Sequence, residues 1–320
     1  MGIVIQTDRA WPDYEVERNI ITGAGHEFVT APTGASADII DSLSAEYDPQ
    51  AIMTCWAIVS ARAIAAPSNL RLVQRMGVGL DNIDVRACTA RGCWVANVPD
   101  YCVEEVADHA VALLLAWARG IAGFDRRTRA NEWDPASARL LRLGTLTVGI
   151  VGLGRIGRAT AGRLQAFGCC VVADDHNSTA VAGVERMPLR KVLERSDAVI
   201  VHAPLTEATH HLFNDSSMGH MKPGAFLINV SRGALVENRA LVRALETGRL
   251  GGAALDVIEG EPEIPEALRR LDNVIMTPHV AFSSETSLLE LRRRAAEEVV
   301  RVLADEQPRY PCNIVRPIPG

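Results

Sequence analysis

The chain has 320 residues, enough for two domains of ordinary size, and 48% of them are apolar, enough for a sizeable core. Its 33 basic residues against 39 acidic ones leave a net charge of -6 with no block of positive charge. This balance argues against a nucleic-acid partner or an anionic membrane surface, so the partner is expected to be a small molecule.

The start of the chain and the cysteines both favour a cytoplasmic protein. The segment MGIVIQTDRAWPDYE has no basic region and its apolar run ends at Gln6, which predicts a first strand rather than a signal peptide. No apolar stretch reaches the ~18 residues of a membrane helix. The seven cysteines show no metal-type spacing and are interpreted as reduced thiols.

Strand and helix patterns alternate along the chain, which indicates an α/β fold with parallel sheets. In the first hundred residues, short strands are predicted at 2–7, 26–30, 51–55, 71–77 and 93–97. They are enough for a compact first domain. Residues 101–120 then predict a long helix that is apolar nearly all round from Ala110 to Trp117 and must be buried on most sides.

From residue 147 the predicted strands are longer and more apolar. They are TVGIVG, CCVVADD, DAVIVHAP, GAFLINVS, GGAALDV and NVIMTP. Six such strands match a doubly wound nucleotide-binding sheet. An amphipathic helix with Leu291, Ala295 and Val299 on one face follows, capped within 283–287, and then a Pro-rich tail. Both could return to the first domain, so we predict a substrate domain of residues 1–99 and 288–320 with a domain of residues 100–287 inserted.

A glycine loop follows the first of these longer strands. In GIVGLGRIGRA, Gly152 suits a tight turn, Gly154 allows close approach of a pyrophosphate, and Gly157 allows a helix to pack on the strand. The next strand ends at Asp174 and Asp175, and Asp175 lies 18 residues after Gly157, where a carboxylate should bind the ribose hydroxyls. Glycines needed for packing alone would not require that carboxylate, so the pattern predicts a dinucleotide site.

The segment after this strand also favours one cofactor. A 2′-phosphate calls for an arginine, and ADDHNSTA offers two acids, a histidine and no arginine. NAD is therefore expected rather than NADP, with His176 the one residue of the segment that argues the other way.

Three ionisable residues each lie just past a predicted strand: Arg232 in INVSRGALV, Glu261 in ALDVIEGEP and His279 in VIMTPHVAF. Each alone has an ordinary interpretation, as a surface charge, a loop acid or a core histidine. Because ligands bind beyond the carboxyl ends of parallel strands, the coincidence of all three favours a catalytic group.

The chemistry that these residues fit is hydride transfer at carbon 2 of a hydroxy or oxo acid. NAD handles the hydride, so the protein must move a proton and hold an anion. His279 has the intrinsic pKa of an acid/base, and Glu261 beside it should raise that pKa. Arg232 would hold the carboxylate and polarise the carbonyl with its planar fork.

The chain resembles the D-isomer-specific 2-hydroxyacid dehydrogenase family over essentially its whole length. The motifs that carry the resemblance are GVGLDNID (77–84), NVPDYCVEEVADHA (97–110), GIVGLGRIG (149–157), INVSRGALV (228–236), AALDVIEGEP (253–262) and TPHVAF (277–282). Within the family, VPDYC followed by VEEVADHA is most similar to bacterial relatives of the C-terminal-binding-protein branch.

The resemblance implies two Rossmann-like domains, a flavodoxin-like substrate domain and an inserted NAD-binding domain, with a cleft that closes on substrate and a homodimer. It places the catalytic residues at Arg232, Glu261 and His279. Beside the loop glycines, the implied cofactor contacts are Val78, Arg155, Ile156, Asp175, Ala203, Val230, Ser231, Asp256, His279 and Phe282. The implied substrate contacts are Val78, Gly79, Arg232 and His279.

Three departures from family patterns bear on the cofactor, at Ala203, or on the substrate. Ala203 stands where the family often has a threonine or similar polar residue. Val78 stands where the phosphite-oxidising branch has a lysine, which argues against phosphite as the substrate. The segment TCWAIVS, 54–60, lacks the basic residue of the phosphoglycerate-oxidising branch, and Trp56 with Phe282 suggests a pocket for a small or apolar side chain.

The remaining histidines are interpreted as structural. His109 and Trp117 fall in the buried-helix pattern, His202 ends a strand, and His210 with His211 lacks the neighbouring acids of a metal site, so no metal is expected. Two other functions stay open: an NAD(H)-sensing protein like the corepressors of the nearest branch, and a dehydrogenase of an unusual acid such as a phosphono analogue.

Overall fold

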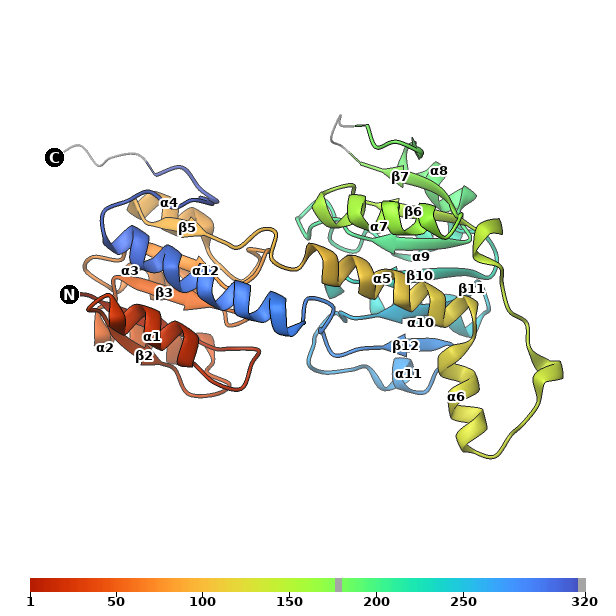
Figure 1. Ribbon diagram of the computed structural model, residues 1–320, viewed down its shortest axis with the longest axis horizontal. Coiled ribbons are helices and arrows are strands. Elements are labelled where there is room, and N and C mark those ends of the chain that lie inside the picture. The colour runs from red at the N-terminus through yellow and green to blue at the C-terminus, as the bar shows by residue number, and fades with distance from the viewer. Residues whose placement is uncertain (176–179, 316–320) are drawn as a thin grey trace. The chain divides into compact units, whose positions relative to one another are not determined.

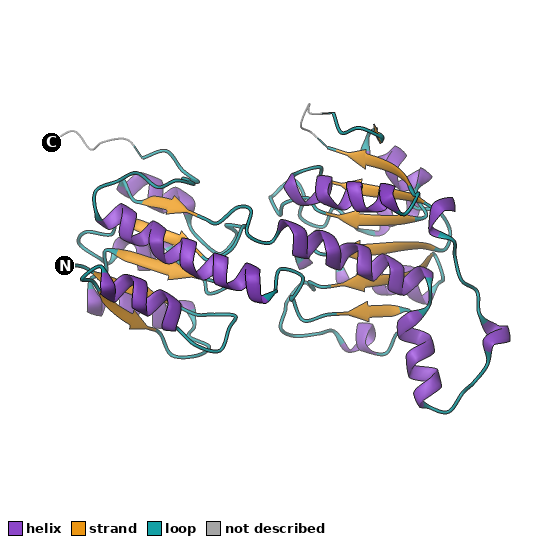
Figure 2. Ribbon diagram, viewed as in Figure 1, coloured by secondary structure: helices purple, strands orange, loops and turns teal. Residues whose placement is uncertain are grey.

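The structure is a computed structural model that describes residues 1–175 and 180–315, so His176 lies outside the described residues. The chain forms two compact units. Unit 1 consists of Met1–Tyr101 and Ser284–Gly320, and unit 2 of Cys102–Ser283. Each has its own parallel sheet with helices on it, which confirms the predicted α/β class (Figure 2).

Unit 2 has a seven-stranded parallel sheet in the order β12-β11-β10-β9-β6-β7-β8. Its strands are β6 (Thr147–Val151), β7 (Cys170–Asp174), β8 (Val184–Arg186), β9 (Ala198–Val201), β10 (Ala225–Asn229), β11 (Leu250–Leu255) and β12 (Val274–Met276). The chain runs outward from β6 in one direction and then from β9 in the other, as in doubly wound folds. Ligands bind such sheets beyond the carboxyl ends of the strands, near this reversal.

Unit 2 also has α-helices, most of which lie over the sheet, whereas α6 extends away from it (Figure 1). They are α5 (Val103–Ala118), α6 (Ile121–Arg129), α7 (Arg155–Ala166), α8 (Leu189–Arg195), α9 (Asp215–His220), α10 (Asn238–Glu246) and α11 (Glu266–Arg269). The predicted apolar helix is α5, which packs against α7 and over β10 and β11. Trp117 stacks on Phe226 with ring centroids 4.5 Å apart, so it is a packing residue as predicted.

One strand and one helix of unit 2 were not predicted, and the additional strand corrects the predicted count of six strands. The strand β8 is only VER, pairs with β7 alone and has no apolar run to reveal it. The helix α6, IAGFDRRTR, carries four charged residues among its nine and buries none of its residues, so it has no apolar run to reveal it. Among the described residues, no single helix is long and apolar enough to span a membrane, and only the bent pair of α5 and α6 reaches that length and composition.

Unit 1 has a five-stranded parallel sheet in the order β2-β1-β3-β4-β5, the order of flavodoxin-like folds. Its strands are β1 (Ile3–Gln6), β2 (Glu27–Thr30), β3 (Ala51–Thr54), β4 (Leu72–Arg75) and β5 (Trp94–Ala96). All five lie where the sequence predicts them. The central strands β3 and β4 are buried along their whole length, as expected for a sheet covered on both faces.

The helices of unit 1 are α1 (Glu15–Gly23), α2 (Ala37–Tyr47), α3 (Ala61–Ala65), α4 (Val85–Arg91) and α12 (Glu285–Leu303). Ser284 caps α12 by accepting the N–H of Ser287, within the predicted range. Leu291, Ala295 and Val299 are buried, so the predicted apolar face is confirmed. The helix packs beside α1, which joins the two ends of the chain in one unit (Figure 1).

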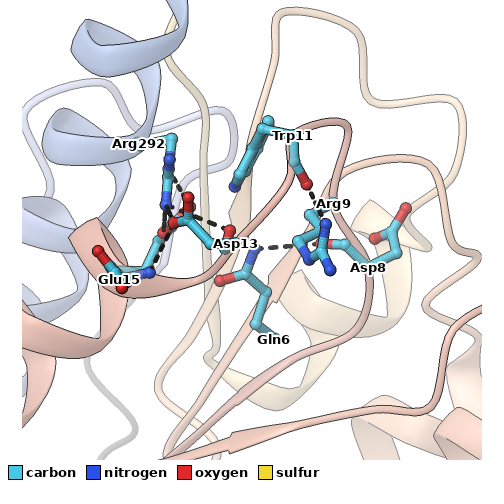
Figure 3. A network of polar contacts seen from close by, with 8 residues as sticks. Gln6, Asp8, Arg9, Trp11, Asp13, Glu15 and Arg292 are labelled. Atoms are coloured by element: carbon cyan, nitrogen blue, oxygen red, sulfur yellow. Dashed lines mark hydrogen bonds and ion pairs between the residues drawn. The ribbon is translucent and has the colours of Figure 1, made fainter.

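A buried ion pair fixes α12 on α1. The guanidinium of Arg292 donates to both carboxylate oxygens of Glu17 at 2.8 to 3.1 Å, and Glu17 is fully buried. Arg292 also donates to Asp13 at 2.6 Å, and this hydrogen bond lowers the pKa of the Asp13 carboxyl (Figure 3). The pair joins segments 275 residues apart, so it specifies how the end of the chain returns to its start.

Arg292→Ala should lower the free energy of unfolding by about 3–5 kcal/mol, because it leaves the Glu17 carboxylate buried and unpaired. Urea denaturation measures the change. The double variant Arg292→Met with Glu17→Leu should recover most of the loss, since it removes both charges. Arg293→Ala is the matched control, because its partner Glu297 lies on the exposed face of the same helix. Equal effects of Arg292→Ala and Arg293→Ala would contradict this account.

Candidate active site

The glycine loop lies between β6 and α7 and has the geometry of a phosphate cradle. Gly152 has φ +99°, and a Cβ there would lie 2.9 Å from the backbone N of Ala203. A Cβ on Gly157 would lie 2.1 Å from the carbonyl oxygen of Gly152, so both positions require glycine. Gly154, the residue before α7, faces open space within 4 Å. The first N–H groups of a helix lack intrahelical partners, so this space fits a pyrophosphate.

The neighbouring residues of the predicted cofactor site also lie at this edge. Arg155 is the exposed first residue of α7, and Ile156 beside it is half-buried. Asp175 directly follows β7, and its Oδ2 is buried without a hydrogen-bond partner. The N–H of Gly152 donates to the carbonyl of Asp174 at 2.9 Å, which holds the glycine loop against the end of β7. An unsatisfied carboxylate oxygen in this place suits a ribose hydroxyl.

The loop after β10 is fixed by a buried amide. Asn229 is fully buried; its Oδ1 accepts the N–H of Ser231 at 3.1 Å and its Nδ2 donates to the carbonyl of Arg232 at 2.8 Å. The hydroxyl of Ser231 donates to the carbonyl of Ala203 at 2.6 Å, which ties this loop to the end of β9. Ala203 and Val230 are both buried here. The loop thus presents Arg232 from a fixed backbone.

The Arg232 loop touches the loop that carries Glu261. A Cβ on Gly233 would lie 2.1 Å from the backbone C of Ile258, so only glycine permits this approach. The N–H of Ile258 in turn donates to Oε2 of Glu261 at 3.1 Å. The strand ends of β10 and β11 therefore bring Arg232 and Glu261 together, as the sequence predicts.

Glu261 and His279 form a close pair. Nδ1 of His279 lies 2.6 Å from Oε1 of Glu261, and 22% of the His279 side chain is exposed. Burial raises the pKa of the Glu261 carboxyl, but the hydrogen bond and charge of His279, the Ile258 N–H and the charge of Arg232 outweigh it, and the net pKa is lowered. Glu261 is therefore ionised at neutral pH. Because it engages Nδ1, proton transfer to a substrate would use Nε2.

A buried carboxylate shapes the turn on which His279 lies. Asp256 directly follows β11 and is only 2% exposed. Its carboxylate accepts hydrogen bonds from the Thr277 hydroxyl at 2.6 Å and from the N–H groups of Val280 and Ala281 at 2.9 Å. Its carbonyl accepts the N–H of His279 at 2.8 Å. His279 has φ +52°, a left-handed conformation that few residues other than glycine adopt. Asp256 thus fixes the turn, and the ring of Phe282 meets His279 edge-on at 6.1 Å.

His109 contributes to this network, which corrects its interpretation as a packing residue alone. Its Nε2 lies 3.0 Å from the hydroxyl of Thr277 and 3.7 Å from Oδ1 of Asp256. The contact links α5 to the turn after β12. Nothing in the local pattern around His109 reveals a partner 168 residues away.

Three further histidines lie at a strand end or in a loop of unit 2. His202 follows β9, where its Nε2 lies 3.0 Å from the Thr160 hydroxyl, and burial lowers its pKa to about 4. This neutral histidine fits the predicted structural role. The pair His210 and His211 was expected to lack an acidic neighbour, and this expectation is wrong: Nε2 of His211 lies 2.6 Å from Oε1 of Glu259. The three groups have ligand atoms within 4.8 Å, close enough for a metal ion, although the His211 contact is already an ordinary hydrogen bond.

In unit 1, Val78 and Gly79 follow β4. The side chain of Asn97 donates to the carbonyl of Val78 at 2.7 Å, and Val78 is 37% exposed. Among the described residues, the N–H groups of Val78 and Gly79 donate no hydrogen bond. This short loop therefore has backbone donors available to an anion.

The loop after β3 is different, because its donors are already used. The carboxylate of Asp8 accepts the N–H groups of Cys55, Trp56 and Ala57 at 2.7 to 3.1 Å. Asp8 itself lies in the loop after β1, where its carbonyl accepts the side chain of Gln6 (Figure 3). An anion of the protein therefore occupies the place where an external anion could otherwise bind.

Comparison with known proteins gives a consistent result. Residues 111–281 match the family model described as D-isomer specific 2-hydroxyacid dehydrogenase, NAD binding domain. A glyoxylate reductase from Korarchaeum cryptofilum is 41% identical over 267 residues, which cover 80% of this chain and 79% of the relative. A D-3-phosphoglycerate dehydrogenase from Mycobacterium leprae is 40% identical over 78% of this chain, but only 48% of the relative is covered.

A solved structure supports the same fold. The NADPH-dependent glyoxylate/hydroxypyruvate reductase from Sinorhizobium meliloti, in complex with NADP and malonate, matches with a TM-score of 0.84 and 31% identity. The match covers 97% of this chain and 96% of that one.

Asp256→Asn should lower kcat at least about tenfold and the free energy of unfolding by about 1–3 kcal/mol, because an amide NH2 must face a buried N–H. Steady-state turnover and urea denaturation measure the two effects. Asp272→Asn, an exposed carboxylate in a loop of the same unit, should change neither. Full turnover in Asp256→Asn would show that the turn does not depend on this carboxylate.

Stability should fall as the pH is lowered from about 6.5 to about 4, in part because His202 stays neutral in the folded state while it gains a proton in the unfolded chain. With a folded pKa below the unfolded one, the unfolded state binds more protons across this window, so acid favours unfolding. His202→Gln should flatten the dependence of the urea midpoint on pH. His210→Gln is an exposed control, and identical pH slopes for wild type and His202→Gln would refute the assignment.

Proposed function

This chain belongs to the D-isomer-specific 2-hydroxyacid dehydrogenases, a family of NAD-dependent oxidoreductases, and we propose that its reaction interconverts a small 2-oxo acid and the D-2-hydroxy acid. The observation that carries the proposal is the 2.6 Å contact between His279 and Glu261 on a turn fixed by Asp256. This pair lies at the carboxyl edge of the same sheet as the glycine loop.

In the proposed reaction, NAD(H) supplies or accepts the hydride when it is bound. His279 moves the proton of the hydroxyl group at Nε2. Glu261, ionised through its contacts, keeps Nδ1 of His279 engaged and compensates the charge of a protonated imidazole. The planar guanidinium of Arg232 binds the substrate carboxylate in a bidentate manner and polarises the adjacent carbonyl.

The residues present fit the cofactor. The open space at Gly154 suits the pyrophosphate, and the unpartnered Oδ2 of Asp175 suits a ribose hydroxyl. We therefore propose that unit 2, with Ala203, Val230, Ser231, Asp256 and Phe282 at its strand ends, is the NAD-binding domain, and that unit 1 contributes the N–H groups of Val78 and Gly79 to substrate binding.

Unit 1 supports a substrate without a phosphate group. The segment 54–60 has no charged residue, and its three backbone donors are bound to Asp8, whose negative charge would repel a phosphate. A glyoxylate-like acid with a small side chain suits these features better than phosphohydroxypyruvate. A homodimer in the cytoplasm is part of the same proposal and rests on the family resemblance.

The test is oxidation of NADH at 340 nm with glyoxylate, pyruvate, hydroxypyruvate and phosphohydroxypyruvate. Turnover should be greatest with one of the small acids and least with the phosphorylated one. His279→Ala should lower kcat by about 10² to 10⁴, the usual contribution of a general acid/base, while NADH binding changes little. His220→Ala, at the end of α9, is the control.

Retained turnover in His279→Ala would remove His279 from the proton-transfer role. NADH binding without turnover of any acid in the panel would instead favour a dinucleotide-sensing protein or an unusual acid substrate.

A further inference from the structure

The structure adds an arginine to the ribose end of the proposed cofactor site. The segment after β7 contains no arginine, which is why the sequence favours NAD over NADP. Arg186 is the last residue of β8, the strand that the sequence did not predict, and β8 lies beside β7 in parallel with Ala173 opposite Arg186. The sheet therefore places Arg186 next to the end of β7, although Arg186 lies 11 residues after Asp175 in the sequence.

Arg186 is held against the backbone of the ribose-binding residue. Its Nη2 donates to the carbonyl oxygen of Asp175 at 2.6 Å. The neighbouring cations are paired elsewhere: Arg190 and Lys191 with Glu194, and Arg195 with Glu185. Among the described residues Arg186 forms no ion pair, so no carboxylate in that part of the chain neutralises its positive charge.

Two polar atoms at this place are buried without partners. One is Oδ2 of Asp175, which can only accept when ionised, and the other is Nε of Arg186, which can only donate. Buried polar groups are almost always hydrogen-bonded, so an unpaired acceptor on Asp175 and an unpaired donor on Arg186, whose Nη2 contacts the Asp175 backbone, indicate a ligand that offers both functions. The hydroxyl groups of a ribose offer both, whereas a 2′-phosphate offers acceptors only.

We propose that Asp175 and Arg186 act together as the selector of the adenosine ribose, an inference that rests on the proposed function. Asp175 favours an unphosphorylated ribose by accepting from its hydroxyls and repelling a phosphate. Arg186 fixes the Asp175 backbone and offers its guanidinium to a 2′-phosphate, so it weakens the discrimination that Asp175 alone would impose. The chain therefore prefers NADH and still binds NADPH.

The test is equilibrium binding of NADH and NADPH to the full chain, followed by the cofactor fluorescence. Wild type should bind NADH more tightly. Arg186→Gln should raise the ratio of the NADPH to the NADH dissociation constant by roughly tenfold, the effect of one charge-assisted hydrogen bond. Asp175→Asn should lower that ratio below one, and Asp175→Asn with Arg186→Gln should lose the gain in NADPH affinity.

Two controls separate the selector from simpler effects. Arg190→Gln removes a nearby positive charge that is paired with Glu194 and should leave the ratio within about twofold. Arg186→Lys keeps the charge without the planar fork and should raise the ratio less than Arg186→Gln does. Thermal melts of each variant confirm that it is folded.

The inference is overturned if Arg186→Gln changes the affinity for both cofactors by the same factor, or if Arg190→Gln has an equal effect on the ratio. If folded wild type binds neither NADH nor NADPH, the proposed function itself fails, and the selector fails with it.

Discussion

The carboxylate of Asp256 is the constraint on which the proposed catalytic arrangement depends. A buried charge is tolerated only when hydrogen bonds compensate it, and here the donors are a hydroxyl and two N–H groups of a single turn. Those contacts bend the chain after β12 so that His279 takes a left-handed conformation. Such a conformation costs of order 1–3 kcal/mol and persists where the surroundings determine it. The same conformation brings Nδ1 of His279 to Glu261.

A second constraint acts on the loops around this turn. Gly233 lets the backbone after Arg232 contact the backbone at Ile258 and Glu259, and any side chain at this position would separate the two loops. His211 adds a contact to Glu259 from a third loop, and its N–H donates to the carbonyl of Ala234 at 2.8 Å. Arg232 and Glu261 are thus positioned by backbone approach, whereas His279 is positioned by a buried charge. The strands alone place these three ionisable groups at the same edge of the sheet. The close backbone approach at Gly233 and the buried charge of Asp256 then set their positions relative to one another.

Much of this could be predicted from the sequence, for a definable reason. The glycine loop, Arg232, Glu261 and His279 each follow an apolar strand, and parallel strands end at one edge, so order along the chain translates into proximity. That logic fails where the strand itself is weak. The polar strand β8 has no periodicity to reveal it, and Arg186 was missed with it. It also fails for side chains that meet across the fold, as with His109 and Thr277 or Arg292 and Glu17, since their separation in sequence leaves no local pattern.

The loop after β3 bears on the proposed substrate, because a carboxylate of the protein itself occupies its backbone donors. Successive backbone N–H groups form a concave anion-binding surface, and at Cys55 to Ala57 the anion is Asp8. Val78 and Gly79 lie in the loop after β4, the strand next to β3 in the same sheet. Among the described residues, the backbone N–H groups of these two residues have no such partner. One loop is therefore neutralised and the other can accept a carboxylate. A substrate with a single anionic group matches this difference, whereas a second anionic group would find its donors occupied and a negative charge beside them.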